Sequence, residues 1–492
     1  TTARRSNDKH PSMADTLKEK TTKGLFWGAL NSGTTQVLNL LIGIMLGRLL
    51  SPGEYGIIGY IAIFTAIAGN LQSSGFSTYL INMKDPKHED FNAVFWFNIL
   101  MSFSLYAILW FAAPLIADFF HQPVLTPLSH FVFLSFVVGS FGITPNAYLT
   151  KKLMVKEMTM INSLALILSG LTGVTLAFLG YSYWSLAWQQ VLYITILNVG
   201  RYYYVPWRPS LHIDLRPIRK MFGFSMNILV VMVMNTVNNN IMSVIIGKFF
   251  NKDILGNYSQ AYKWNFMAYS LVSNTTQQVA QPVFASIANE RERELRVFRK
   301  MMRFTAFLAF PAMFGLVLVA REFILITIGA KWIDAVPLLQ ILAVSGAFFP
   351  FYTLYQNMVI GHGRADINMW CNILQIALQI ILMLCTHSLG ILVMITVYSG
   401  FNILWLLAWQ TQAHRLIGLS LWQVVKDMAP FLLAAGGVMA VTGCCTQAIG
   451  TPIVLLLARI AMAGVLYFAV MKVARVQILE ECLQFAKNKF KK

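Results

Sequence analysis

The chain has 492 residues, of which 57% are hydrophobic and only 12% are charged. A soluble domain carries about 25% charged residues, because its surface needs a polar cover. The composition therefore excludes a soluble protein and predicts an all-α integral membrane protein. The net charge of +18 would favour nucleic-acid binding in a soluble chain. In a membrane protein, basic residues collect in cytoplasmic loops instead, so no nucleic-acid partner is expected.

The first apolar segment follows a polar N-terminus. Met13 is the expected natural start, which would place residues 1–12 outside the native chain. A spanning helix needs about 20 mostly apolar residues, and about fourteen segments satisfy this requirement. The predicted spans are 24–47, 55–80, 92–113, 127–149, 159–180, 184–204, 223–248, 257–281, 303–326, 336–360, 368–387, 390–413, 429–449 and 452–474.

Basic residues predict the orientation of these spans. If the N-terminus is cytoplasmic, 31 of the 38 Lys and Arg residues fall in cytoplasmic segments and 5 in outer loops. Such an excess is the positive-inside pattern of membrane proteins. Both termini are therefore expected in the cytoplasm. The outer loops are short, so the chemistry is expected among the helices.

Two stretches of the sequence each resemble a later stretch. GRLLSPGEYG at 47–56 aligns with GKFFNKDILG at 247–256, and PLSHFVFLSF at 127–136 resembles PLLQILAVSG at 337–346. Six spans separate the copies, so both run in the same direction, as in a parallel repeat about an axis along the membrane normal. Two similar lobes around a central cleft are typical of a transporter.

The repeat defines the expected domains. They are a cytoplasmic segment (1–23), an N-lobe of six helices (24–204), a cytoplasmic linker (205–222), a C-lobe of six helices (223–413), two further helices (414–474) and a basic cytoplasmic tail (475–492).

Polar residues recur on single faces of three predicted helices. In 257–281 the face carries Ser259, Lys263, Ser270, Asn274, Gln277 and Gln281; in 24–47 it includes Gln36 and Asn39; in 223–248 Asn235 and Asn239 stand in an asparagine-rich stretch. Polar groups are costly in lipid, so these faces are expected to line a water-filled path. The alternative is that the amides join helices through interhelical hydrogen bonds.

Charge distinguishes the substrate classes. No Asp or Glu lies in the interior of a predicted span, whereas a proton- or sodium-coupled cation exporter usually needs such a carboxylate. Lys263 lies about seven residues inside its span and would favour an anionic group such as a phosphate. The alternative is that Lys263 reaches the outer headgroups. The five cysteines have neither CxxC spacing nor a histidine partner, so no metal site, cofactor or catalytic residue is indicated.

Three segments resemble a known family. GRLLSPGEYG, GAKWIDAVPLLQILAVSG at 329–346 and GHGRADI at 361–367 are similar to segments of the bacterial polysaccharide-repeat flippases. These belong to the multidrug/oligosaccharidyl-lipid/polysaccharide exporter superfamily, and the likeness extends over nearly all of residues 14–475. It implies two six-helix lobes plus two helices, alternating access, and a substrate made of a short oligosaccharide on a polyprenyl pyrophosphate.

The sequence differs from one branch of this superfamily in the position of its basic residues. The peptidoglycan-precursor branch of this superfamily carries arginines within its first helix, but the interior of span 24–47 has none. Arg48, Lys248 and Lys263 are expected to take their place, by charge and position. The expected substrate-binding residues are Lys263, Asn274, Gln277, Gln281, Asn235, Asn239, Gln36, Asn39, Arg48 and Lys248.

The sequence thus predicts a flippase, not an enzyme, in the bacterial cytoplasmic (inner) membrane. It would turn polyprenyl-pyrophosphate-linked oligosaccharides from the inner to the outer leaflet for surface polysaccharide biosynthesis. Its expected partners are the lipid-linked oligosaccharide, membrane lipids and polysaccharide assembly proteins. The alternatives are a cation-coupled multidrug exporter of the same superfamily and, from another class, a membrane glycosyltransferase or polysaccharide polymerase.

Overall fold

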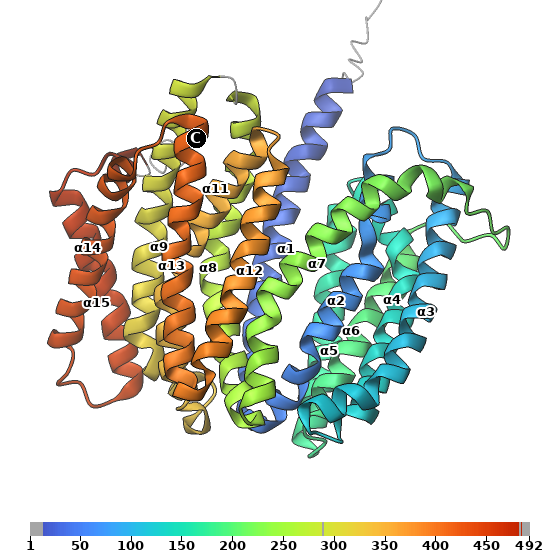
Figure 1. The fold of residues 1–492 in the computed structure, drawn as a ribbon, viewed down its shortest axis with the longest axis horizontal. Helices are drawn as coiled ribbons and strands as arrows, with labels where there is room; N and C mark the ends of the chain where they lie inside the picture. Colours follow the sequence, from blue (N-terminus) through green and yellow to red (C-terminus); the bar gives the residue numbers. More distant parts are fainter. Residues whose placement is uncertain (1–12, 288–289, 482–483, 485–492) are drawn as a thin grey trace, which may run out of the picture. The chain divides into compact units, whose positions relative to one another are not determined.

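The computed structural model describes residues 13–287, 290–481 and 484. The predictions for residues 1–12 and for most of the basic tail lie outside these residues. The part of the chain that is described folds into helices (Figure 1).

The helices follow one another with short connections. They are α1 (Met13–Leu49), α2 (Pro52–Asn82), α3 (His88–Phe120), α4 (Leu125–Lys151), α5 (Val155–Phe178), α6 (Trp184–Tyr204), α7 (Arg216–Phe249), α8 (Lys252–Ile287), α9 (Arg291–Thr327), η1 (Ala330–Trp332), α10 (Ala335–Gly346), α11 (Phe349–Gly361), α12 (Ala365–Thr386), η2 (His387–Leu389), α13 (Ile391–Ile417), α14 (Leu421–Cys445) and α15 (Pro452–Val473).

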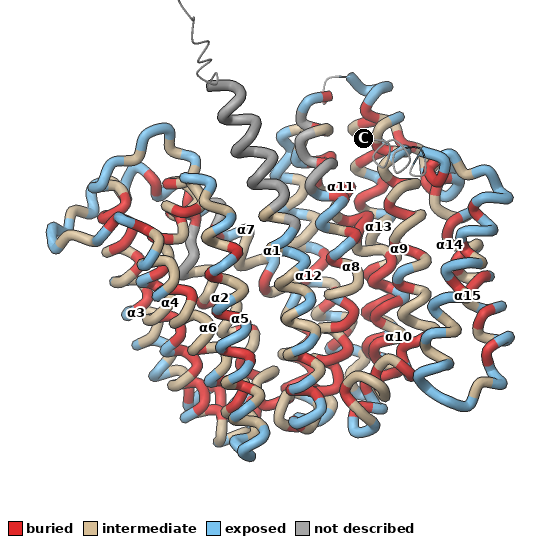
Figure 2. The backbone as a smooth tube through the Cα atoms, turned by 180° about the vertical axis from the view of Figure 1, so that it is seen from behind, coloured by how far each residue is buried: buried red, intermediate tan, exposed pale blue. Residues whose placement is uncertain are grey.

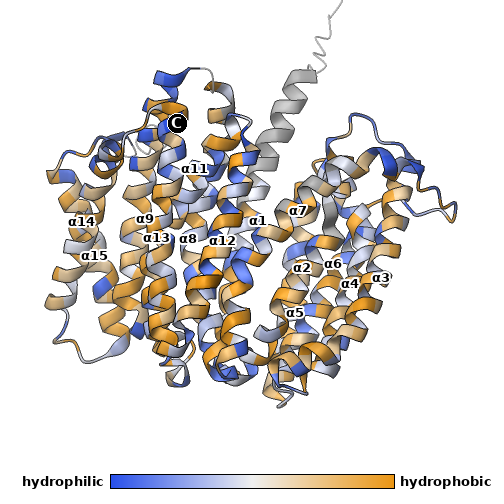
Figure 3. Cartoon of the chain, viewed as in Figure 1, coloured by the Kyte–Doolittle hydropathy of each residue, from blue (hydrophilic) through white to orange (hydrophobic). Residues whose placement is uncertain are grey.

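Each predicted span coincides with a helix, except that 336–360 is divided between α10 and α11. Among the described residues, ten helical segments are long and apolar enough to cross a membrane. Helices α1, α6, α7 and α8 are not among the ten, and α7 and α8 contain the polar stretches 235–240 and 273–278. Figure 3 shows hydrophobic residues along the helices and hydrophilic residues concentrated in the connections. The chain is therefore an all-helical, multi-pass membrane protein.

The chain forms two compact units. The first comprises Thr1–Leu49 and Phe64–Val233, and the second comprises Leu50–Ile63 and Met234–Lys492. In the first unit, α3 packs against α4, α5 against α6, and α1 against α5. In the second, α8 packs against α10 and α11, whereas α14 and α15 pack against α9. Figure 2 shows buried, intermediate and exposed residues along the helices and mostly exposed residues at the connections.

The surface of α15 is apolar where a soluble protein would be polar. Leu457, Ile460 and Val465 are all more than half exposed. Exposed aliphatic side chains on successive turns are expected of a helix that faces lipid.

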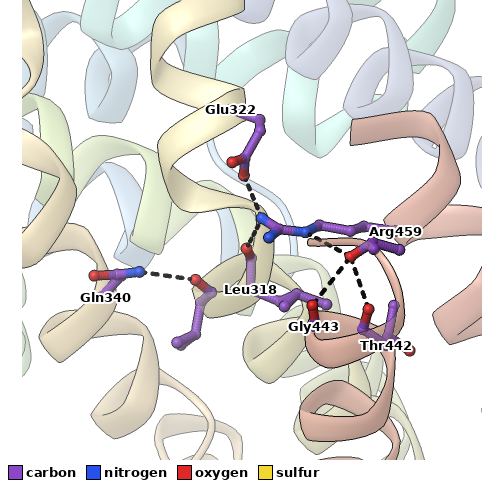
Figure 4. Close-up of polar contacts among 8 residues, drawn as sticks. Leu318, Glu322, Gln340, Thr442, Gly443 and Arg459 are labelled. Atoms are coloured by element: carbon purple, nitrogen blue, oxygen red, sulfur yellow. Dashed lines mark hydrogen bonds and ion pairs between the residues drawn. The ribbon is translucent and has the colours of Figure 1, made fainter. Parts of the chain in front are cut away.

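An ion pair joins α15 to α9 within the second unit (Figure 4). Arg459 Nη1 donates to Glu322 Oε2 at 2.7 Å and to the backbone oxygen of Leu318 at 2.9 Å. Arg459 Nε donates to Thr446 Oγ1 at 3.2 Å. Both charged side chains are largely buried, so each provides the countercharge that the other needs away from water.

Candidate functional site

A polar pocket of about 220 Å³ lies within the second unit, among α7, α8, α11, α12 and α13. Its lining residues all carry amide, hydroxyl or aromatic side chains. They are Asn235, Asn238, Asn239, Tyr262, Phe266, Tyr269, Ser270, Ser273, Asn274, Phe349, Tyr352, Thr353, Gln356, Asn372, Gln375, Gln379, Tyr398 and Asn402.

The composition of this lining is unusual for a membrane helix bundle. Nine of the lining side chains are amides, four are tyrosines, two are phenylalanines and three are Ser or Thr. Among these described lining residues, none is charged and none is aliphatic. Because polar groups are costly inside a membrane, so many of them around one cavity indicate a ligand that forms hydrogen bonds.

An amide cluster forms one wall of the pocket. Asn402 on α13 accepts hydrogen bonds at Oδ1 from Gln375 Nε2 at 3.0 Å and Gln379 Nε2 at 2.7 Å, both on α12. Gln375 and Gln379 are one helical turn apart and so lie on the same face of α12. Tyr352 on α11 donates its hydroxyl to the backbone oxygen of Asn402 at 2.5 Å. These bonds hold three helices together and fix the orientation of the amides.

The same cluster leaves polar atoms without a partner. Gln375 Oε1, Gln379 Oε1 and Asn402 Nδ2 are buried and form no hydrogen bond. All three side chains are at most 2% exposed. A buried polar group without a partner costs about 1–3 kcal/mol. The wall thus retains two acceptors and one donor for a ligand that brings hydrogen bonds.

Aromatic rings form another part of the lining. The rings of Tyr269 on α8 and Phe349 on α11 are stacked, with centroids 4.9 Å apart and planes at 27°. Tyr262 and Phe266, one turn apart on α8, are nearly parallel as well, with centroids 6.3 Å apart. Parallel ring pairs provide flat, rigid surfaces beside the amide wall.

Three of the predicted substrate-binding residues lie in this pocket: Asn235 and Asn239 of α7, and Asn274 of α8. Lys263 lies half-buried on α8, one residue after Tyr262, with Nζ 5.4 Å from the centroid of the Trp264 ring. It does not line the pocket.

The remaining predicted residues lie elsewhere. Gln277 is exposed on α8, and the side chain of Gln281 lies outside the described part of the structure. Lys248 is half-buried in the last turn of α7. In the first unit, Gln36 and Asn39 are half-buried on α1, and Arg48 is exposed in its last turn. Their roles in substrate binding stay predictions.

The predicted site residues did not include those of α11, α12 and α13. Gln356, Asn372, Gln375, Gln379 and Asn402 all interrupt apolar helices. The signal that could have revealed them is the same one used for α8, since amides inside a span are rare and are usually functional.

A second cavity of about 380 Å³ lies among α9, α14 and α15. Its lining is apolar apart from Arg459 and Tyr467, and Arg459 is already paired with Glu322. Among the described residues, no group of three or more His, Cys, Asp or Glu residues could hold a metal ion. The pocket with the amide wall is therefore the stronger candidate site.

The fold defines the class of protein. The structure of the lipid II flippase MurJ, in an inward closed conformation, matches with a TM-score of 0.77 and 13% sequence identity, covering 92% of this chain and 100% of MurJ. At this identity the likeness concerns the fold alone. It is the fold of a multi-pass membrane protein made only of helices.

Sequence comparison identifies the family. Lipopolysaccharide biosynthesis protein WzxC of Escherichia coli (strain K12) is 25% identical over 364 residues, which are 73% of this chain and 73% of WzxC. Teichuronic acid biosynthesis protein TuaB of Bacillus subtilis (strain 168) is 25% identical over 434 residues, 85% of this chain and 87% of TuaB. Residues 45–337 match the family described as polysaccharide biosynthesis protein. The chain belongs to this family of polysaccharide biosynthesis proteins, and it is a multi-pass membrane transporter and not an enzyme.

Proposed function

We propose that this protein is a flippase that moves polyprenyl-pyrophosphate-linked oligosaccharides from the inner to the outer leaflet for surface polysaccharide biosynthesis. The observation that carries the proposal is the pocket lined only by amide, hydroxyl and aromatic side chains. Amides and hydroxyls both donate and accept hydrogen bonds, as sugar hydroxyls do. The name of WzxC refers to lipopolysaccharide biosynthesis, that of TuaB to teichuronic acid biosynthesis and that of MurJ to a lipid II flippase. These names support a lipid-linked sugar as cargo.

The proposed topology has fourteen crossings with both termini in the cytoplasm. The lobes 24–204 and 223–413, joined by the linker 205–222, would expose the cargo alternately to the two sides. Two observations support this arrangement. Every predicted span coincides with a helix or, for 336–360, with a pair of helices. The basic residues also concentrate in the segments assigned to the cytoplasm.

The pyrophosphate of the cargo needs cations, which the pocket does not supply. Lys263, Arg48 and Lys248 are the proposed residues, because an ammonium or guanidinium group forms strong charge-assisted hydrogen bonds with phosphate oxygens. Lys263 follows Tyr262, a lining residue of the pocket, directly in α8. The amides Gln36, Asn39, Gln277 and Gln281 are proposed to bind sugar hydroxyls along the same path. Membrane lipids and polysaccharide assembly proteins are the proposed partners.

A cation-coupled multidrug exporter is the second candidate, because tyrosine and phenylalanine rings also attract organic cations. The lining residues that the structure describes include no carboxylate to neutralise such a cation or to couple its export to a proton. A membrane glycosyltransferase or polymerase is a weaker candidate. General acid–base catalysis needs a titratable side chain in reach of the substrate, and among the described residues that line the pocket the titratable groups are four tyrosine hydroxyls.

The decisive experiment measures leaflet reorientation in proteoliposomes that contain the purified full-length protein. The probe is a fluorescent polyprenyl-pyrophosphate trisaccharide, and its exposure on the outside is read with a membrane-impermeant quencher. The proposal predicts reorientation that depends on the protein. If the lipid stays in its leaflet while the protein exports ethidium, the protein is a multidrug exporter and not a flippase. If the glycan becomes longer or is released, the protein is an enzyme.

A further inference from the structure

The pocket differs from the rest of the proposed path in carrying no charge. We infer that it is a binding site for one uncharged sugar ring of the transported oligosaccharide, and that it rejects acidic sugars and the pyrophosphate. This inference rests on the proposed function and specifies which part of the cargo the site takes.

Charge is the first argument. A carboxylate or phosphate that leaves water must gain a cation or several hydrogen-bond donors, or it does not enter. None of the described lining residues is Lys, Arg or His. The amide wall cannot substitute for a cation, because Asn402 Nδ2 is its one unpaired donor, whereas Gln375 Oε1 and Gln379 Oε1 are acceptors that repel an anion. An uncharged ring meets no such penalty.

Size is the second argument. The pocket encloses about 220 Å³, which is below the roughly 300–1,000 Å³ of pockets that take drug-sized molecules. A lipid-linked oligosaccharide is larger than a drug, so the pocket takes only a fragment of it. A single pyranose ring with its hydroxyls is the natural fragment, because the oligosaccharide of the cargo is built from such rings.

The hydrogen-bond pattern is the third argument. Each sugar hydroxyl carries one donor and two acceptor positions. Donated hydroxyl protons match Gln375 Oε1 and Gln379 Oε1, and a hydroxyl oxygen matches Asn402 Nδ2. Three unpaired atoms on two adjacent helices therefore require a partner that both donates and accepts, which an apolar ligand or a simple cation does not do.

The aromatic pairs supply the fourth argument. A pyranose ring has faces of C–H groups in addition to its hydroxyls, and such faces form weak contacts with aromatic rings. Tyr269 and Phe349 are stacked at 4.9 Å, and both line the same cavity as the amide wall. A flat aromatic surface beside a hydrogen-bonding wall suits a ring that is apolar on its faces and polar at its edge.

The test compares two lipid-linked trisaccharides that differ at one position, where one carries glucose and the other glucuronate. Reorientation of each is measured in proteoliposomes with the full-length protein. We expect the glucose substrate to move at least about tenfold faster, because the ring that enters the pocket must be uncharged.

Two variants determine whether the pocket is the source of this preference. Asn239→Lys adds an ammonium group at an exposed lining residue of the pocket. Asn240→Lys adds the same group one residue further along α7, where the native amide donates instead to the backbone oxygen of Thr236. We expect Asn239→Lys to reduce the preference for glucose at least about fivefold through charge pairing, whereas Asn240→Lys leaves it as in the wild type.

Each outcome decides one of the two proposals. No reorientation of either substrate by folded wild-type protein overturns the proposed function itself. Equal rates for the two substrates leave the flippase in place and overturn the neutral-sugar site. If the rates differ but both lysine variants change the preference to the same degree, the preference arises in another part of the path. The same holds if neither variant changes it. Both outcomes overturn the neutral-sugar site. A shift confined to Asn239→Lys supports the inference.

Discussion

Gly56 on α2 and Gly256 on α8 bring the backbones of their two helices into direct contact. A Cβ added at Gly56 would lie 1.9 Å from the backbone oxygen of Lys252, and one added at Gly256 would lie 1.8 Å from that of Pro52. The two glycines end the matching segments GRLLSPGEYG and GKFFNKDILG. Positions that correspond in the sequence repeat therefore meet in the structure, and each requires glycine because the neighbouring atoms are main chain.

We expect Gly56→Ala and Gly256→Ala each to destabilise the protein by more than about 3 kcal/mol, which is beyond the usual range for overpacked sites. The cost is large because the atom that the new methyl group meets belongs to the main chain and cannot rotate away as a side chain can. The measurement is thermal unfolding in detergent, read as loss of the monodisperse peak in size-exclusion chromatography. Gly69→Ala on the same α2 is the control, because a Cβ there meets nothing within 4 Å. Equal melting temperatures for all three variants would contradict the close approach.

Lys263 gives a prediction about transport. If it binds the pyrophosphate, Lys263→Ala should slow reorientation of the lipid-linked trisaccharide at least about tenfold, because a charge-assisted hydrogen bond to phosphate is lost. Lys252→Ala, an exposed lysine in the first turn of the same helix, is the matched control and should keep the wild-type rate. An unchanged rate in Lys263→Ala would assign this side chain to the headgroup region instead.

The ion pair between Arg459 and Glu322 predicts a non-additive effect on stability. Arg459→Met alone leaves the carboxylate of Glu322 buried, 6% exposed, and without its cation. Removing one partner of a buried pair costs about 3–5 kcal/mol, whereas replacing both by apolar residues is often neutral. The double variant Arg459→Met/Glu322→Leu should therefore recover most of the melting temperature.

The comparison for this prediction is an exposed pair. Arg364 and Asp366 are both about half exposed and lie 2.9 Å apart, and Arg364→Ala should cost less than about 1 kcal/mol. If the double variant is as unstable as Arg459→Met, the ion pair stabilises the folded protein by more than neutralising its own two buried charges.

Glu294 makes stability depend on pH. This residue in the first turn of α9 is fully buried, and its Oε2 lies 3.2 Å from Nε2 of His362. Burial raises the pKa of the Glu294 carboxyl to about 7, and the neighbouring imidazole opposes that shift. His362 Nδ1 lies 3.0 Å from the backbone oxygen of Met358, which orients the imidazole beside the carboxyl group.

The sign follows from proton binding. The folded protein holds a proton on Glu294 between pH 4.5 and about 7, where the unfolded chain releases it, so stability falls as pH rises through this window, by at most about 1.4 kcal/mol per pH unit. Glu294→Gln should remove this part of the pH dependence of the melting temperature, while Glu290→Gln, at an exposed residue, should keep it. Identical pH profiles for wild type and Glu294→Gln would refute the assignment.

The sequence predicted the helices well because a spanning helix leaves a direct signal, a run of about 20 apolar residues. It did not predict the break between α10 and α11, since Ala347 and Phe348 are as apolar as their neighbours. Hydropathy measures transfer into lipid and does not report where a helix stops.

Three of the residues that line the pocket were predicted, and the lining residues of α11, α12 and α13 were not. Asn235, Asn239 and Asn274 stand in dense polar stretches of α7 and α8, which a helical projection reveals. The amides of α12 and Asn402 of α13 stand in separate, otherwise apolar helices, and only the tertiary fold brings them together. Lys263 directly follows Tyr262 in α8, but successive residues are rotated by about 100° around the helix axis. The side chain of Lys263 therefore lies on a different face of α8 from that of Tyr262, outside the pocket lining.

The bond between Arg459 and Glu322 has a consequence for biogenesis. Arg459 is the eighth residue of α15, and an arginine at the centre of an isolated helix opposes insertion into the bilayer by about 2.5–3.5 kcal/mol. Its countercharge lies 137 residues earlier in the chain. The last helix therefore depends on α9 being already in the membrane when it leaves the translocon.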